Sequence, residues 1–146
     1  MADKPMPTID QMLCFAVYAA GHAFTRFYKP RLDALELTYP QYLVFLVLWE
    51  RDDLTVKALG DKLFLDSGTI TPLIKRLEAR GLVERRRDED DERQVRIRLT
   101  SAGRALKGKA EAIPLAVVEG TGLSLDGVET LRQELLALRE RLDSIG

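Results

Sequence analysis

The sequence predicts a mostly α-helical fold with one small β-hairpin. Two observations lead to this prediction. Apolar residues recur at helical spacing through most of the 146 residues, which is typical of amphipathic helices. Residues 94–100 instead alternate apolar and polar side chains, the period of two that indicates a half-buried strand. Residues 82–87 come shortly before this segment and supply a second strand for a hairpin.

Length and composition indicate an ordinary globular protein. The chain has 46% hydrophobic and 31% charged residues, which suits one packed domain over residues 1–146. No apolar run approaches the roughly 18 residues that span a bilayer, and the N-terminus lacks the features of a secretory signal. We therefore expect a cytoplasmic protein without a membrane partner.

The first two predicted helices differ in how their apolar residues are arranged. The first covers residues 8–28 and should end near Pro30, because proline disfavours helix in the residue before it. Its apolar residues form one stripe. The second begins around Thr38 with Pro40 near its first position. It is apolar nearly all round, so we expect it, with Trp49, in the core.

Two short helices follow. Thr55 is a plausible N-cap for the third helix, and Asp66 or Ser67 for the fourth, which should end at Gly81. Pro72 fits an α-helix only near its first turn. The fourth helix therefore starts either at these caps or later than Ser67.

The C-terminal part is predicted to be helical again. A helix from Thr100 or Ser101 should continue past Pro114 with a kink or break, and a turn near Gly122 should precede the last helix. Together with the stripe on the first helix, the leucines of the last helix exceed what one small domain needs to bury. We predict a homodimer formed through the helices of residues 1–36 and 101–146. The leucine stripe consists of Leu131, Leu135, Leu138, Leu142 and Ile145.

Residues 37–100 read as a winged helix-turn-helix, since two short helices are followed by a basic hairpin. A recognition helix needs small or hydrogen-bonding outer residues that can approach base edges. A wing needs cations for phosphates or the minor groove. The outer residues of the fourth helix are Ser67, Gly68, Thr69, Thr71, Lys75 and Arg76. The wing cations are Arg85, Arg86, Arg87, Arg93, Arg96 and Arg98, not all of which can face DNA.

The charge distribution leaves two interpretations open. Ten basic and seven acidic side chains lie between Lys75 and Arg104, a local net charge of +3 in a chain of net charge −1. A charge run is often only a solvated surface, and the acidic turn 88–92 would repel phosphate. The combination of a helix-turn-helix pattern with an arginine hairpin favours DNA binding.

Three segments resemble regulators of the MarR family. The segment Asp66–Glu78, which includes Pro72, is similar to the recognition helix of that family, and Gly81–Val83 and Asp90–Arg93 resemble its helix end and wing. The resemblance implies that Asp91 orients Arg93 and that Arg93 enters the minor groove. It also implies a double-stranded, pseudo-palindromic DNA operator as the partner.

Cys14 is the chain's single cysteine, and His22, to which we assign no role, is its single histidine. These counts exclude an intrachain disulfide and a thiolate cluster, so we expect no catalytic residue, metal or cofactor. Tyr18 lies one helical turn from Cys14 and can touch it. Tyr28 lies on the same face but about 21 Å along the helix, so it could reach Cys14 only from a second copy. Alternatively, Cys14 is a small core residue and the tyrosines only pack.

Residues 12–19, 28–30 and 37–42 resemble the organic hydroperoxide resistance regulators (OhrR) within the MarR family. The resemblance implies that Cys14 is the reactive residue and that the hydroxyls of Tyr18, Tyr28 and Tyr39 surround it, some from the partner subunit. A resolving second cysteine is missing, which implies a one-cysteine mechanism. The oxidised sulfur would then form a mixed disulfide with a low-molecular-weight thiol, react with a backbone nitrogen or overoxidise.

These observations predict a repressor, not an enzyme, that releases its operator when organic hydroperoxide oxidises Cys14. One alternative is a MarR-type repressor gated by a small phenolic ligand. A less favoured one is a thiol peroxidase, which would need a means of recycling its cysteine.

Overall fold

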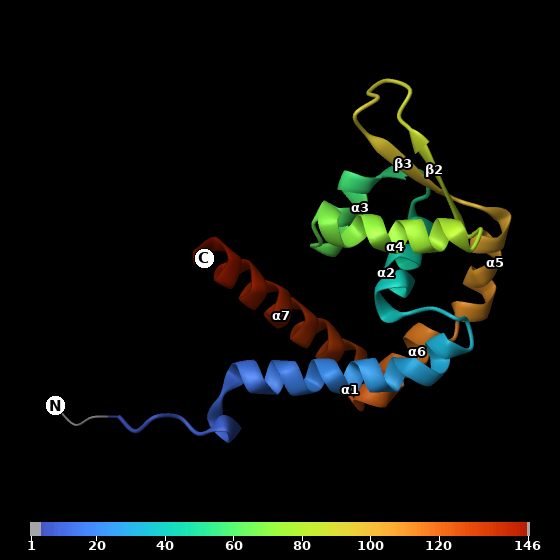
Figure 1. Ribbon diagram of the computed structural model, residues 1–146. Helices are drawn as coiled ribbons and strands as arrows, with labels where there is room; N and C mark the ends of the chain where they lie inside the picture. Colours follow the sequence, from blue (N-terminus) through green and yellow to red (C-terminus); the bar gives the residue numbers. More distant parts are fainter. Residues whose placement is uncertain (1–3, 146) are drawn as a thin grey trace. The chain divides into compact units, whose positions relative to one another are not determined.

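The computed structural model describes residues 4–145 and is mostly helical (Figure 1). It contains two compact units, the first ending at Ala110 and the second beginning at Glu111. In the first unit lie η1 (Ile9–Gln11), α1 (Leu13–Asp33), α2 (Tyr39–Glu50), β1 (Leu54–Thr55), α3 (Val56–Leu63), α4 (Ser67–Ala79), β2 (Val83–Arg87), β3 (Val95–Leu99) and α5 (Ser101–Ala110). In the second lie α6 (Ile113–Thr121) and α7 (Leu125–Ile145).

Helix α1 differs from its prediction at both ends. It begins at Leu13, because the 3-10 helix η1 occupies the residues before it. The prediction that it ends near Pro30 is wrong, since it continues to Asp33. Proline removes one backbone hydrogen bond, and two side-chain bonds support the last turns. Arg31 donates to the Phe27 carbonyl over 2.9 Å, and Lys29 pairs with Asp33 at 3.1 Å.

Helix α2 forms the centre of the first unit, as predicted. It begins with a capping box, in which the Gln41 amide donates to Thr38 Oγ1 (3.3 Å) and the Thr38 amide to Gln41 Oε1 (3.0 Å). Its buried apolar residues are Tyr42, Val44, Phe45, Val47 and Leu48. Trp49 is half-buried, and its indole N–H donates to the Gly103 carbonyl of α5 over 3.0 Å.

Helices α3 and α4 form the helix-turn-helix. The predicted caps are both present: Thr55 accepts from the Ala58 amide at 3.0 Å, and Asp66 accepts from the Thr69 amide at 2.9 Å. The turn between the helices passes so close to α3 that a Cβ on Gly60 would lie 2.6 Å from the Leu65 carbonyl oxygen. A larger residue at position 60 would therefore displace the turn.

The alternative in which α4 starts later than Ser67 is wrong. The helix begins at Ser67 and contains Pro72. The missing N–H of Pro72 would have paired with the carbonyl of Gly68, so one bond near the start of the helix is lost. The ring of Pro72 lies on the exposed face and displaces no core residue. Gly81, with a φ of +74°, follows the end of the helix as predicted.

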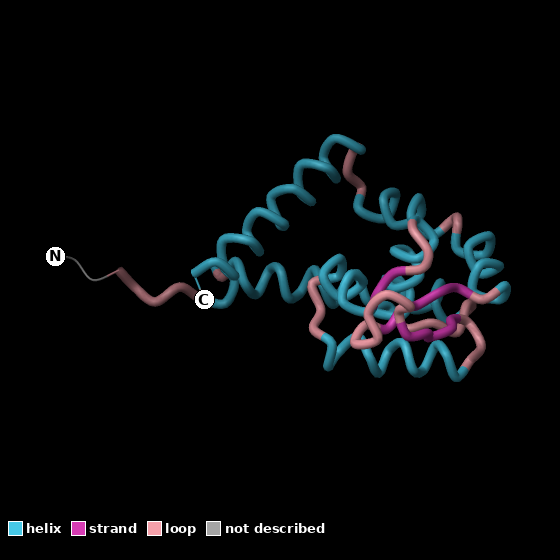
Figure 2. The backbone as a smooth tube through the Cα atoms, turned by 90° about the horizontal axis from the view of Figure 1, so that it is seen from above, coloured by secondary structure: helices cyan, strands magenta, loops and turns pink. Residues whose placement is uncertain are grey.

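The predicted hairpin is present and carries a third strand, in the antiparallel order β1-β3-β2. Figure 2 shows the three strands side by side. Val83 pairs with Leu99, and Leu54 pairs with Ile97. Ile97 and Leu99 are buried, which confirms the inward-facing alternation predicted for β3. Strand β1 was not predicted, because two residues are too few to show the alternation of apolar and polar side chains that indicates a strand.

The second unit contains the predicted break and turn. Helix α6 begins at Ile113 with Pro114 in its first turn, and Gly122, at a φ of +70°, ends it. Ser124 precedes α7 and accepts from the Gly127 amide at 3.0 Å. None of residues 125–145 of α7 is buried. Among the helices described, none is both long and apolar enough to span a membrane.

Candidate DNA interface and redox site

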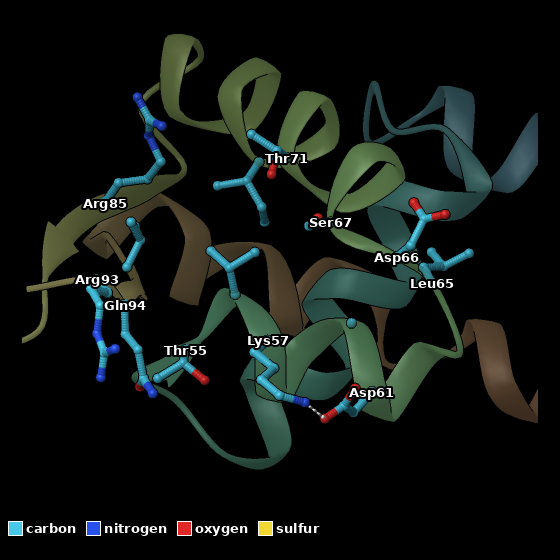
Figure 3. A pocket seen from close by; sticks show the side chains of 14 residues that line it. Thr55, Lys57, Asp61, Leu65, Asp66, Ser67, Thr71, Arg85, Arg93 and Gln94 are labelled. Carbon is cyan, nitrogen blue, oxygen red and sulfur yellow. Dashed lines mark hydrogen bonds and ion pairs between the residues drawn. The ribbon is translucent and has the colours of Figure 1, made fainter. Parts of the chain in front are cut away.

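A groove of about 540 Å³ lies between α4 and the wing, which we define as β2, β3 and the turn between them. Lys57 of α3 also lines it, together with Thr55 at the end of β1 (Figure 3). Ser67 and Thr71 line the groove from α4, and Arg85 and Arg93 line it from the wing. The groove thus joins the two elements that the sequence predicts to read DNA.

The predicted base-reading residues lie on the outer face of α4. The inner face consists of the buried residues Ile70, Leu73, Ile74 and Leu77. Thr71 is half-buried at the edge of the groove. This arrangement gives the small, hydrogen-bonding surface that a recognition helix needs. The exposed residues are Ser67, Gly68, Thr69, Pro72, Lys75 and Arg76.

Arg93 projects from the wing with its side chain 91% exposed. Asp91 binds the guanidinium of this side chain: Nε of Arg93 donates to Oδ1 over 3.1 Å, and Nη2 donates to Oδ2 over 3.3 Å. The backbone amide of Arg93 also donates to Asp91 Oδ1 at 3.1 Å. The structure thus contains the contact between Asp91 and Arg93 that the family resemblance implied, and the role of Arg93 in DNA binding stays a prediction.

Arg85 and Arg86, two more of the predicted wing cations, point to different faces. Arg85 lies on the groove side, where its Nε donates to Glu78 Oε1 of α4 over 3.0 Å. Arg86 is the strand partner of Arg96, and directly paired residues share one face of a sheet. The structure therefore places Arg86 with Arg96 on the opposite face of the wing, outside the groove.

A charged cluster on that opposite face was not predicted. Arg96 pairs with Asp53 at 3.0 Å and with Asp88 at 2.9 Å. The side-chain hydrogen bonds from Arg96 lower the pKa of both carboxyl groups, and those to the carboxylates raise the pKa of Arg96. The sequence showed the arginine but not its partner, since Asp53 lies 43 residues away.

Cys14 lies in the first turn of α1 and is an exposed, free cysteine. Tyr18, one turn further along, is 64% exposed. Its ring contacts that of His22, with a centroid distance of 4.3 Å. The interpretation of Cys14 as a core residue does not fit its exposure.

Tyr28 and Tyr39 belong to a second aromatic group at the other end of α1. Their ring centroids lie 4.8 Å apart, and Tyr42 lies 5.7 Å from Tyr28. Burial, together with the neighbouring Tyr39 and Tyr42, raises the pKa of Tyr28 to about 12. Burial likewise raises the pKa of Tyr39. Both phenols are therefore protonated at neutral pH and can donate hydrogen bonds. Tyr42, three residues after Tyr39 on α2, was expected only as a core residue of that helix and not as a member of this group.

One chain does not bring Cys14 together with the half-buried Tyr28 and Tyr39. Cys14 and Tyr28 lie on the same helix, α1. Their spacing along that helix corresponds to about 21 Å at 1.5 Å per residue. Between residues 4 and 145, no group of three or more His, Cys, Asp or Glu side chains is placed to hold a metal ion.

Residues 26–110 match the family described as "Transcriptional regulator SarA/Rot". The chain is 57% identical over 140 residues to the HTH-type transcriptional regulator TtmR of Methylorubrum extorquens, covering 96% of this chain and 71% of TtmR. It is 48% identical over 137 residues to the organic hydroperoxide resistance transcriptional regulator of Bacillus subtilis, covering 94% and 91% of the two chains. The chain belongs to the organic hydroperoxide resistance branch of the MarR family.

Solved structures agree with this membership. Reduced and overoxidized AbfR, each solved bound to DNA, are 37% identical to the chain, with 89% of this chain and 91% of AbfR covered and a TM-score of 0.76. The relatives are named as regulators of transcription, not as enzymes. This member of the MarR family is thus a DNA-binding transcriptional regulator with a winged helix-turn-helix fold.

Proposed function

We propose that this MarR-family regulator is a homodimeric repressor that releases its operator when organic hydroperoxide oxidises Cys14. The observation that carries the proposal is the exposed free thiol in the first turn of α1. A peroxide must reach the sulfur, so a sensing cysteine has to be accessible.

The dimer is supported by the apolar surface that one chain leaves uncovered. Leu13, Val17 and Phe24 of α1 are 43–64% exposed, and Leu32 is the one buried residue among those described in that helix. On α7, Leu135 is 44% and Leu142 is 62% exposed. Exposed rows of apolar side chains on each of these helices are typical of an interface. A second copy of the chain is its proposed occupant.

An antiparallel pair of α1 helices would bring Cys14 of one copy near the Tyr28 and Tyr39 phenols of the other. The thiolate would attack the terminal oxygen of the hydroperoxide, so that an S–O bond forms and the O–O bond breaks. The sulfur is oxidised by two electrons, and the peroxide leaves as an alcohol. A low-molecular-weight thiol would then displace the hydroxyl as water and form a mixed disulfide. The phenols would donate hydrogen bonds to the thiolate and to the oxidised sulfur.

In the reduced dimer, each α4 would enter a major groove of the operator and each Arg93 the adjacent minor groove. Oxidation would change the packing around Cys14 and, with it, the spacing of the two α4 helices, which lowers affinity for the operator. The protein would consume one oxidant for each event. Its targets would be genes for peroxide detoxification.

The test is binding to a labelled duplex selected in vitro on the reduced protein, followed by addition of cumene hydroperoxide and a small thiol. We expect wild type to release the duplex and Cys14→Ser to retain it. Reduction with excess dithiothreitol should restore wild-type binding. This last step separates reversible oxidation from overoxidation, because dithiothreitol reduces a sulfenic acid or a mixed disulfide but not a sulfinic or sulfonic acid.

Release by the serine variant on oxidant addition contradicts the sensing role of Cys14. Release of both proteins by a phenolic compound, but not by peroxide, supports the ligand-gated alternative instead.

A further inference from the structure

We propose that Arg96 is a positioning residue of the DNA interface, which holds the wing turn and through it the exposed Arg93. The inference rests on the proposed insertion of Arg93 into the minor groove. It assigns no direct DNA contact to Arg96, whose side chain lies on the face of the wing opposite the groove.

Arg96 joins the wing to the loop between α2 and β1. Its Nε donates to Asp53 Oδ1 over 3.0 Å, and its Nη2 donates to the Asp53 carbonyl over 2.7 Å. The third nitrogen, Nη1, donates to Asp88 Oδ2 over 2.9 Å. Every nitrogen of the guanidinium is therefore engaged, which orients its plane. Asp53 has a φ of +58°, a conformation uncommon for a residue other than glycine.

Asp88 carries this connection into the turn. Its other carboxylate oxygen, Oδ1, accepts from the Asp90 amide at 2.8 Å and from the Asp91 amide at 3.2 Å. Asp91 in turn binds the Arg93 guanidinium. A continuous series of hydrogen bonds thus runs from Asp53 through Arg96, Asp88 and Asp91 to the side chain proposed to enter the minor groove.

The same contacts account for an acidic turn in a DNA-binding wing. Residues 88–92 carry five carboxyl groups in a row, which repel one another and would repel phosphate. Asp88 is 12% exposed on its side chain, so its charge is poorly screened by water and depends on Arg96. Without Arg96 the turn would open, and Arg93 would be mobile in the free protein. It would then have to lose this conformational freedom when DNA binds, which would lower the affinity for DNA.

The chain offers a matched control in Arg98. It lies two residues further along β3 on the same face, and its side chain is 40% exposed against 37% for Arg96. Within residues 4–145 its ion pair is with Asp53 Oδ2, at 3.4 Å, and not with Asp88. Arg98→Met removes the same charge and leaves the connection from Asp53 to the turn in place.

The experiment is a double-mutant cycle on affinity for the selected duplex under reducing conditions. We expect Arg93→Ala to weaken binding of the duplex about tenfold. Arg96→Met should weaken it by a factor between about threefold and tenfold. In the Arg93→Ala background Arg96→Met should have little further effect, because Arg96 acts through Arg93. Arg98→Met should weaken binding less than Arg96→Met, by a factor that is the same with and without Arg93.

Amide hydrogen exchange gives a readout that a simple loss of charge would not change. Arg96→Met should speed exchange at the Asp90 and Asp91 amides, whereas Arg98→Met should leave them as in wild type. If Arg96→Met does not fold, Asp88→Asn provides the second variant. It keeps an acceptor for the turn amides and removes the ion pair with Arg96.

The outcomes separate the two hypotheses. Wild-type affinity in Arg93→Ala overturns the proposed minor-groove role and the inference that rests on it. Weaker binding by Arg93→Ala, with an Arg96→Met effect that is undiminished in that background, overturns the positioning role alone. Equal amide exchange in the Arg96 and Arg98 variants also overturns it.

Discussion

The groove proposed to face DNA and the helix that carries Cys14 differ in how many of their proposed functional contacts form within one chain. On the wing, Asp91 pairs with Arg93, and at the groove Asp66 caps α4, both within one chain. On α1, Cys14 is exposed at one end, and the half-buried phenol of Tyr28 lies at the other, against Tyr39 of α2. The comparison indicates that one protomer contains the proposed DNA-contacting residues in place, whereas the proposed peroxide sensing needs two protomers. Variants that disturb one region should therefore leave the other measurable.

The largest expected effect on operator affinity comes from disrupting the proposed dimer. Leu135→Lys combined with Leu142→Lys places charges on the exposed stripe of α7, and we expect monomers. Operator affinity should fall about a hundredfold, because two linked half-site contacts become independent. Sedimentation and titration of the selected duplex would measure both changes. Glu140→Lys, which alters charge away from the stripe, should remain dimeric, and a dimeric double-lysine variant would contradict the proposed interface.

A smaller effect is expected within the groove. Asp66→Ala removes the acceptor of the Thr69 amide at the start of α4, so unfolding should become easier by about 1 kcal/mol. Urea denaturation would measure this loss, while the peroxide response of the remaining folded protein should persist. Asp66→Asn keeps an acceptor and should retain most of the stability. If alanine and asparagine behave alike, the cap contributes little to α4.

The smallest effect concerns the phenols. Because the pKa of Tyr28 is raised to about 12, the folded state favours the protonated phenol. The stability from this preference is fully present below about pH 10, the ordinary tyrosine value, and is lost as pH rises through 12. Absorbance at the phenolate band should show a component titrating near pH 12 that disappears in Tyr28→Phe. Loss of a component near pH 10 instead would place Tyr28 in a solvent-like environment.

Short-range signals accounted for most of the elements and for the outer face of α4. Thr55 and Asp66 cap helices as predicted, since each cap depends on an amide only a few residues away. Pro30 shows where such rules fail. The rule that proline ends a helix considers only the backbone. Here the helix continues beyond Pro30, supported by the hydrogen bond from Arg31 to the Phe27 carbonyl and the ion pair of Lys29 with Asp33.

The sequence by itself determined the winged helix-turn-helix, the outward residues of α4 and the distance along α1 between Cys14 and Tyr28. Periodicity encodes these features, because helix and strand geometry convert spacing directly into position. Only the tertiary structure decided that Arg86 faces away from the groove and that Arg96 binds Asp53. Those outcomes depend on the register of β3 with β2 and β1. Register brings together residues far apart in the chain, and no local pattern records which of them will meet.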